Sequence, residues 1–189
     1  FVFPFYMEYV LKYSPALAGS PLIIIPAFMS IGTPISGTLS DRIGYRLPTF
    51  IGFLLISLGT FMVVILSSET TNIYEIIIFL MVIGLGMGIF TAPNNSSIMG
   101  ISPPGKLSLV GGFLNMMRSL GLIFGVSFTT FVYELNMQGK LYNFPPVVLE
   151  SFRNSMTMLF VFSMIGLILT LVKGKAKVEK VTHLPVSME

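Results

Sequence analysis

The longest stretches without charge set the strongest limit on what this chain can fold into. Residues 47–67 contain no charged side chain, and a helix needs about 20 mostly apolar residues to cross a hydrocarbon core about 30 Å thick. Similar apolar runs occupy residues 1–11, 16–39, 73–93, 107–133 and 152–172. Only 10% of all residues are charged, too few to give a globular domain a polar surface. The sequence predicts an all-α, polytopic membrane helix bundle with five complete spans and part of another at residues 1–11.

A transmembrane β-barrel is the alternative architecture, and the pattern of the runs argues against it. Barrel strands alternate apolar and polar residues in segments of about ten, whereas residues 50–66 do not alternate. The run at 16–39 contains prolines and glycines, which membrane helices accommodate as kinks. We therefore expect one kinked helix there.

The two ends of the chain predict its organisation. Residue 1 is Phe rather than Met, and residues 1–11 read like the interior of a helix, so we expect a truncated first helix. Residues 1–172 then form one transmembrane unit, and the lysine-containing residues 173–189 form a tail outside the membrane.

Orientation is predicted from the distribution of lysine and arginine, which favour cytoplasmic loops. With the charged turn near Asp41 inside, the cytoplasmic side carries Arg42, Arg46, Lys106, Lys173, Lys175, Lys177 and Lys180, and the other side carries Lys12, Lys140 and Arg153. The excess predicts a multi-pass plasma-membrane protein whose Asp41 turn and C-terminal tail are cytoplasmic.

Residues 37–46 form a charged, glycine-containing segment between two apolar runs. Asp41 at a helix end can accept hydrogen bonds from backbone N–H groups, and Arg42 and Arg46 can pair with it or with the last carbonyls of a helix. Gly44 permits a positive φ, and Gly37 permits close approach of another helix. Such a segment either holds helix ends together in one conformational state or only orients the protein.

Arg118 is the charge farthest from any loop, about 16 Å into the run that begins at residue 107. Charged residues at such depth face a bundle interior or an aqueous cavity, although a structural arginine bound to backbone carbonyls is the other interpretation. Asn115 lies one turn earlier on the same face. Asn94 and Asn95 end the preceding run, where they either bind substrate or satisfy the helix end.

Small residues spaced four apart predict helix packing, at Gly84 with Gly88 and at Gly121 with Gly125. Flexible methionines and flat aromatic rings suit a cavity of broad specificity, but they also suit lipid contact. The candidates are Met81, Met87, Phe90, Met116, Met117 and Phe124.

Several functions are disfavoured by residues that are missing. The sequence has no cysteine and a single histidine, His183, in the tail, so we expect no metal site, no redox chemistry and no cofactor. No catalytic set is present, and no basic helix is available for nucleic acid, so we expect neither an enzyme nor a nucleic-acid-binding protein. No Asp or Glu lies deep in a run, so proton-carrying carboxylates would have to lie elsewhere in the protein.

The segment Gly37-x-x-x-Asp41-Arg42-x-Gly44-x-Arg46 resembles the cytoplasmic loop signature of the major facilitator superfamily, with Tyr45 where a basic residue is usual. Together with the segments 84–95 and 111–121, it resembles the C-terminal half of the fourteen-helix drug:proton antiporters of the EmrB/QacA type. The resemblance implies that Asp41 gates the cytoplasmic side by contacting a helix end in the other half, with Arg42 and Arg46 as its partners.

The resemblance also implies a six-helix half that works with a missing N-terminal half in the lipid bilayer. The implied activity is alternating-access export of hydrophobic or cationic compounds in exchange for protons. Two alternatives stay open: an uptake permease for a small organic solute of the same superfamily, and a membrane scaffold that transports nothing.

Overall fold

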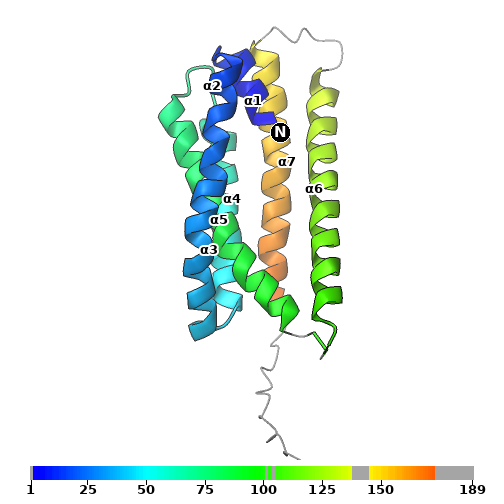
Figure 1. The fold of residues 1–189 in the computed structure, drawn as a ribbon. Helices are drawn as coiled ribbons and strands as arrows, with labels where there is room; N and C mark the ends of the chain where they lie inside the picture. Colours follow the sequence, from blue (N-terminus) through cyan, green and yellow to red (C-terminus); the bar gives the residue numbers. More distant parts are fainter. Residues whose placement is uncertain (1, 101, 104, 138–144, 173–189) are drawn as a thin grey trace, which may run out of the picture.

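In the computed structural model, residues 2–100, 102–103, 105–137 and 145–172 are described, and their regular structure is helical throughout (Figure 1). The elements are α1 (Val2–Phe5), the π-helix η1 (Tyr6–Val10), α2 (Pro15–Gly19), the 3-10 helix η2 (Ser20–Ile23), α3 (Ile24–Ile43), α4 (Arg46–Leu66), α5 (Ile73–Met99), α6 (Leu107–Met137) and α7 (Pro145–Val172). Five of these segments are long and apolar enough to cross a membrane, with α2, η2 and α3 counted as one. The predicted membrane helix bundle with five complete spans is confirmed.

Four predicted helix ends are wrong, and in each case the helix is longer than predicted. Helix α3 continues past residue 39 to Ile43, α5 continues past Pro93 to Met99, α6 continues to Met137, and α7 begins at Pro145 rather than near residue 152. The predicted ends lie where the sequence turns polar. Polar residues mark the edge of the apolar layer, however, and backbone hydrogen bonding in a helix can continue beyond that edge. Proline is also well suited to the first position of α7, where its missing N–H needs no partner.

The predicted irregular helix is present, with its distortion near its start. Residues Pro15–Ile43 form one helical segment that tightens to 3-10 geometry over Ser20–Ile23. Pro21 and Pro26 each lack a backbone N–H donor, which weakens regular α-helical bonding in this stretch. Pro34, in contrast, lies inside regular α-helix.

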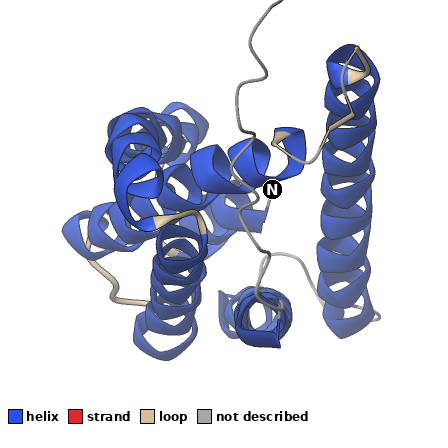
Figure 2. Ribbon diagram, turned by 90° about the horizontal axis from the view of Figure 1, so that it is seen from below, coloured by secondary structure: helices blue, strands red, loops and turns tan. Residues whose placement is uncertain are grey.

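Helix α5 packs between α3 and α4, and α4 also packs on α7, whereas α6 lies at the edge of the bundle against α7 (Figures 1 and 2). Two arginines tie α4 to α7 at opposite ends. Arg46 Nη2 donates to the Leu171 carbonyl at 2.8 Å, and Arg153 Nε donates to the Val64 carbonyl at 3.0 Å. Each arginine thereby satisfies a carbonyl in the last turns of the other helix.

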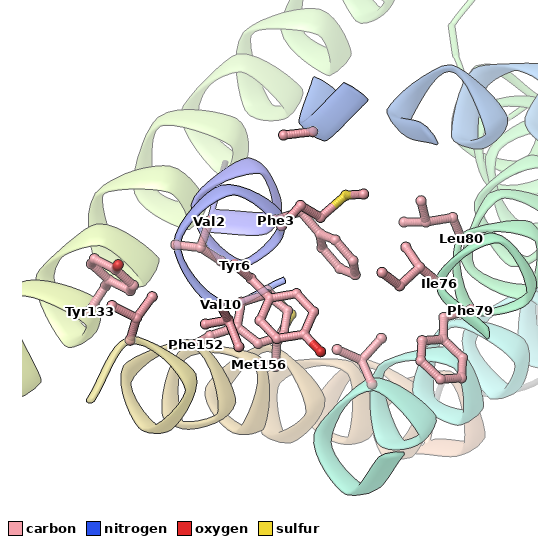
Figure 3. Packing of buried hydrophobic residues seen from close by; sticks show 14 of the residues in the cluster. Val2, Phe3, Tyr6, Val10, Ile76, Phe79, Leu80, Tyr133, Phe152 and Met156 are labelled. Atoms are coloured by element: carbon pink, nitrogen blue, oxygen red, sulfur yellow. The ribbon is translucent and has the colours of Figure 1, made fainter. Parts of the chain in front are cut away.

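The buried core lies at the end of the bundle where α1 and η1 fit between longer helices, away from the Gly44 turn (Figures 1 and 3). The Tyr6 ring stacks on Phe152 with centroids 4.4 Å apart, and its hydroxyl donates to the Ser68 carbonyl at 2.7 Å. Phe3 meets Phe152 edge-on at 5.2 Å. Aromatic packing thus holds α1 and η1 against α7 at this end of the bundle.

The outer faces of the helices are apolar, as the interior is. On α6, Leu122, Ile123 and Phe124 are 62–64% exposed. Exposed apolar faces on helices of this length match the hydrocarbon of a bilayer, in which helices satisfy their own backbone groups. The chain is therefore a multi-pass membrane protein.

Candidate functional site

The charged segment 37–46 is mostly helix rather than loop. Residues up to Ile43 belong to α3, Arg46 starts α4, and only Gly44 and Tyr45 connect them. Gly44 has φ 83°, in the region that glycine adopts most easily. Its conformation explains how two membrane-length helices reverse direction within two residues.

Asp41 consequently lies in the last turn of α3 and does not cap a helix N-terminus. A carboxylate at a helix C-terminus gains nothing from the helix dipole, so the local stabilisation considered from the sequence is absent. Asp41 is exposed, and within the described part of the chain neither it nor Arg42 makes a hydrogen bond or an ion pair. Gly37 has no atom of another helix within 4 Å of a Cβ placed on it. Any partner for this face of α3 must come from outside the described residues.

Arg46 is the basic residue of the segment that does have a partner, the Leu171 carbonyl of α7. The sequence allowed the arginines either to pair with Asp41 or to bind the last carbonyls of a helix. Arg46 does the latter. Arg46 also borders a cavity of about 250 Å³ that reaches from Tyr45 to Gly166 and Thr170 on α7.

A larger cavity of about 640 Å³ lies between α3, α4, α5 and α6. Three of the predicted polar pathway residues, Asn94, Asn95 and Arg118, line it. The remaining lining is largely apolar and comprises Met29, Phe53, Ile56, Met87, Phe90, Thr91, Ile98, Phe113, Leu114, Met117 and Leu122. The volume lies in the range of small-molecule sites, about 300–1,000 Å³. The cavity is therefore the strongest candidate for substrate contact in this chain.

Arg118 reaches across the cavity to α5, where its Nη2 lies 3.4 Å from Asn95 Oδ1. Helical side chains point toward the N-terminus of their helix, so the guanidinium lies closer to the Gly44 end of the bundle than its backbone does. Asn95 is inside α5, four residues before Met99. The sequence placed Asn95 at a helix end, but α5 continues for one more turn beyond it. The side chain of Asn95 lines the cavity and contacts Arg118 there.

Not all residues proposed from the sequence line this cavity. Asn115 does not line it and makes no bond to Arg118, so the polar pair spans two helices rather than one turn of α6. Among the flexible and aromatic candidates, Met87, Phe90 and Met117 line the cavity, whereas Met81, Met116 and Phe124 do not.

Other lining residues were not singled out from the sequence. Phe53 of α4 meets Phe90 edge-on at 4.6 Å, and both rings border the two cavities. Met29 and Phe113 face the larger cavity from α3 and α6. An almost uniformly apolar run does not indicate which face of its helix turns toward a cavity. Among these lining residues only Thr91, which is polar, could have been identified from the sequence.

The two glycine pairs lie in different surroundings. A Cβ on Gly84 would lie 2.7 Å from the Ile25 carbonyl oxygen, and one on Gly88 would lie 2.5 Å from that of Met29. These glycines therefore bring α5 against α3, and a hydrogen bond from Ser36 Oγ to the Gly88 carbonyl at 3.3 Å crosses the same contact.

A Cβ on Gly121 or Gly125 would meet nothing within 4 Å in the described chain. Both residues instead border a cavity of about 220 Å³ with Val2 and Met156. Their predicted role in helix packing stays a prediction that requires a helix from outside the described residues.

Comparison with known proteins gives the family. The family model described as Major Facilitator Superfamily matches residues 1–185. The riboflavin transporter RibZ of Clostridioides difficile is 31% identical over 90% of this chain and 38% of its own length. The quinolone resistance protein NorB of Staphylococcus aureus is 27% identical over 66% of this chain and 27% of its own. The multidrug resistance protein Stp of Mycobacterium tuberculosis is 25% identical over 64% of this chain and 22% of its own.

The chain thus spans less than half the length of these relatives. The match nevertheless covers nearly all of its residues and coincides with five membrane-length helices around a mostly apolar cavity. On this evidence the chain belongs to the major facilitator superfamily, a family of membrane transporters.

Proposed function

We propose that this chain is the C-terminal half of a fourteen-helix secondary transporter of the EmrB/QacA type, which exports hydrophobic compounds in exchange for protons. The observation that carries the proposal is the largely apolar cavity of about 640 Å³ between α3, α4, α5 and α6. Relatives named for multidrug and quinolone resistance support export of organic compounds. The sequence favoured hydrophobic or cationic substrates, and the lining supports the hydrophobic part.

The proposed mechanism is alternating access, in which this half rocks against an N-terminal half around the cavity. The packed aromatic core around Tyr6 would let the half move as a rigid body. Asp41 would gate the cytoplasmic side by contacting a helix end of the other half. Its exposure, and the lack of any partner within the described chain, support a partner of that kind.

Proton exchange would require carboxylates from the other half. Glu8 is in η1, Glu75 begins α5, Glu134 is in the last turn of α6 and Glu150 is in the second turn of α7. None of these lines the large cavity, and its described lining contains no Asp or Glu.

Export can be tested with everted membrane vesicles that contain the complete protein, including the N-terminal half that the proposal requires. Energised vesicles should accumulate a fluorescent hydrophobic probe, and nigericin, which dissipates the pH gradient, should release it. Accumulation that is the same with and without the pH gradient would refute proton exchange.

Uptake of a small organic solute is the second candidate; a relative named as a riboflavin transporter supports a small organic solute. Right-side-out vesicles separate the two directions. An imposed inward proton gradient should leave an exporter unable to concentrate solute inside, whereas a proton-coupled uptake permease would concentrate it.

The proposed sidedness can be measured with single cysteines, because this chain contains none of its own. With the Asp41 turn inside, Ser40→Cys should be labelled by an impermeant maleimide only after the cells are opened. Ser68→Cys, in the connection between α4 and α5, should be labelled in intact cells. The reverse pattern would refute the orientation.

A further inference from the structure

We infer that the large cavity binds organic anions, and that Arg118 and Asn95 receive the anionic group. The ligand class is an aromatic or otherwise apolar compound that carries a carboxylate or a similar planar oxyanion. This inference rests on the proposed function, since it names the substrate class of the same cavity. It replaces the cationic substrate that the sequence had left open.

The first support is the unused hydrogen-bonding capacity of Arg118. A guanidinium has five N–H donors, and the described chain gives Arg118 one acceptor, the neutral Asn95 Oδ1 at a long 3.4 Å. No carboxylate of the described residues forms an ion pair with it. Arg118 is exposed to the cavity that it lines, so its remaining donors are open to a bound molecule.

The second support is the balance of donors and acceptors around Arg118. Asn95 accepts from Arg118, so its amide nitrogen is left to donate, and it has no acceptor within the described chain. The hydroxyl of Thr91 is engaged with the Met87 carbonyl at 2.6 Å. Arg118 and Asn95 thus each keep free N–H donors, from which an anion can accept, while Asn94 and the Thr91 oxygen add acceptors to the same cavity.

The third support is the strength of the bonds that a charged guanidinium can form with an anion. Charged residues within a membrane protein normally pair with an opposite charge or face water. Arginine with a carboxylate can form two parallel hydrogen bonds, which are stronger than bonds between neutral groups. A bound carboxylate would therefore stabilise Arg118 as well as be held by it.

The apolar lining specifies the body of the ligand. Phe53, Phe90 and Phe113 present rings, while Met87 and Met117 present flexible thioethers. Aromatic rings pack favourably against both kinds of side chain. A molecule of one or two fused rings with a single carboxylate suits this combination.

The competing explanation is that a carboxylate of the N-terminal half pairs with Arg118. In that case Arg118 would be neutralised before substrate arrives, and the charge of the substrate would not matter to it. The two explanations differ in a measurable quantity, the preference between ligands of equal shape and different charge.

The test uses the complete transporter in lipid nanodiscs and three isosteric probes: 2-naphthoate, neutral 2-naphthamide and the cation 2-naphthylmethylammonium. Binding is measured by the change in naphthyl fluorescence. Wild type should bind 2-naphthoate about 10- to 100-fold more tightly than 2-naphthamide, the range expected for hydrogen bonds to a charged group. Arg118→Gln should lose this preference but keep its affinity for 2-naphthamide, which also reports that the cavity is intact.

Arg118→Lys should retain part of the preference, and it keeps the test decisive if Arg118→Gln fails to fold. Arg153→Gln, at the opposite end of the bundle, is the matched control and should keep the wild-type preference. Tighter binding of the cation by wild type, or an unchanged preference in Arg118→Gln, would overturn the inference.

Counterflow of the same probes in proteoliposomes distinguishes this inference from the proposed function. Counterflow without charge preference would refute the anion site and leave transport standing. Charge-selective binding without counterflow of any probe would support the anion site and refute transport.

Discussion

The substitution Gly88→Ala tests a close backbone contact between α3 and α5. A Cβ at Gly88 would lie 2.5 Å from the Met29 carbonyl oxygen, 3.0 Å from the Met29 Cα and 3.1 Å from the Gly32 Cα. All three are backbone atoms, so no side-chain rotation can relieve the contact. Helices α3 and α5 would have to separate by most of an ångström to restore ordinary van der Waals distances.

The expected change has two parts of opposite sign. Overpacking a well-packed contact costs about 1–3 kcal/mol, while replacing glycine by alanine inside a helix returns about 0.5–1 kcal/mol. We expect Gly88→Ala to lower the free energy of unfolding by about 1–2 kcal/mol on this basis. Gly112→Ala in α6 is the control, because a Cβ there meets nothing within 4 Å, so only the stabilising part should act.

The two variants should therefore shift the melting temperature in opposite directions. The measurement is thermal unfolding of the complete protein, purified in one detergent, with helicity followed by circular dichroism. A Gly88→Ala protein that melts at or above the wild-type temperature would refute the close α3–α5 contact. A destabilised Gly112→Ala protein would show that alanine at a helical glycine lowers stability without a close contact, so the effect of Gly88→Ala could not be assigned to the α3–α5 contact.

Three further substitutions test single contacts. Arg46→Gln removes the bond to the Leu171 carbonyl and should speed amide hydrogen exchange in the last turn of α7 about two- to fivefold; unchanged exchange would contradict the contact. Asp41→Ala removes the carboxylate that is exposed in the described chain and is proposed to contact the other half, so it should abolish proton-driven export; retained export would refute the gate. Tyr6→Phe removes the hydroxyl bond to the Ser68 carbonyl but keeps the ring, so it should lower the free energy of unfolding by about 1 kcal/mol. Tyr6→Ala also removes the ring and should lower it clearly more; equal losses would contradict the ring's role in the core.

Hydropathy identified the helices because the bilayer leaves the backbone few choices. Every N–H and C=O in hydrocarbon must be satisfied within the segment, so an uncharged run such as residues 47–67 becomes a helix. The ends were less predictable. Asn94 and Asn95 are polar, yet α5 continues through them to Met99, because helical hydrogen bonding persists beyond the apolar layer.

The candidate site was partly predictable because charge is rare in this chain. Arg118 could be selected from the sequence as a charge deep within an apolar run and Asn95 as a polar group at the end of one, and the structure brings them to one cavity. Phe53 and Met29 could not be selected, since an almost uniformly apolar run has no polar face from which the inward side could be read.

By itself, the sequence determined the helical membrane fold, the charged segment between α3 and α4, and the family signature carried by that segment. Tertiary structure alone decided which side chains meet. Gly84 with Gly88 and Gly121 with Gly125 share the same spacing, yet only the first pair touches another helix of the described chain. The physical reason is that spacing places two glycines on one face of a helix, whereas the packing of the other helices decides what that face meets.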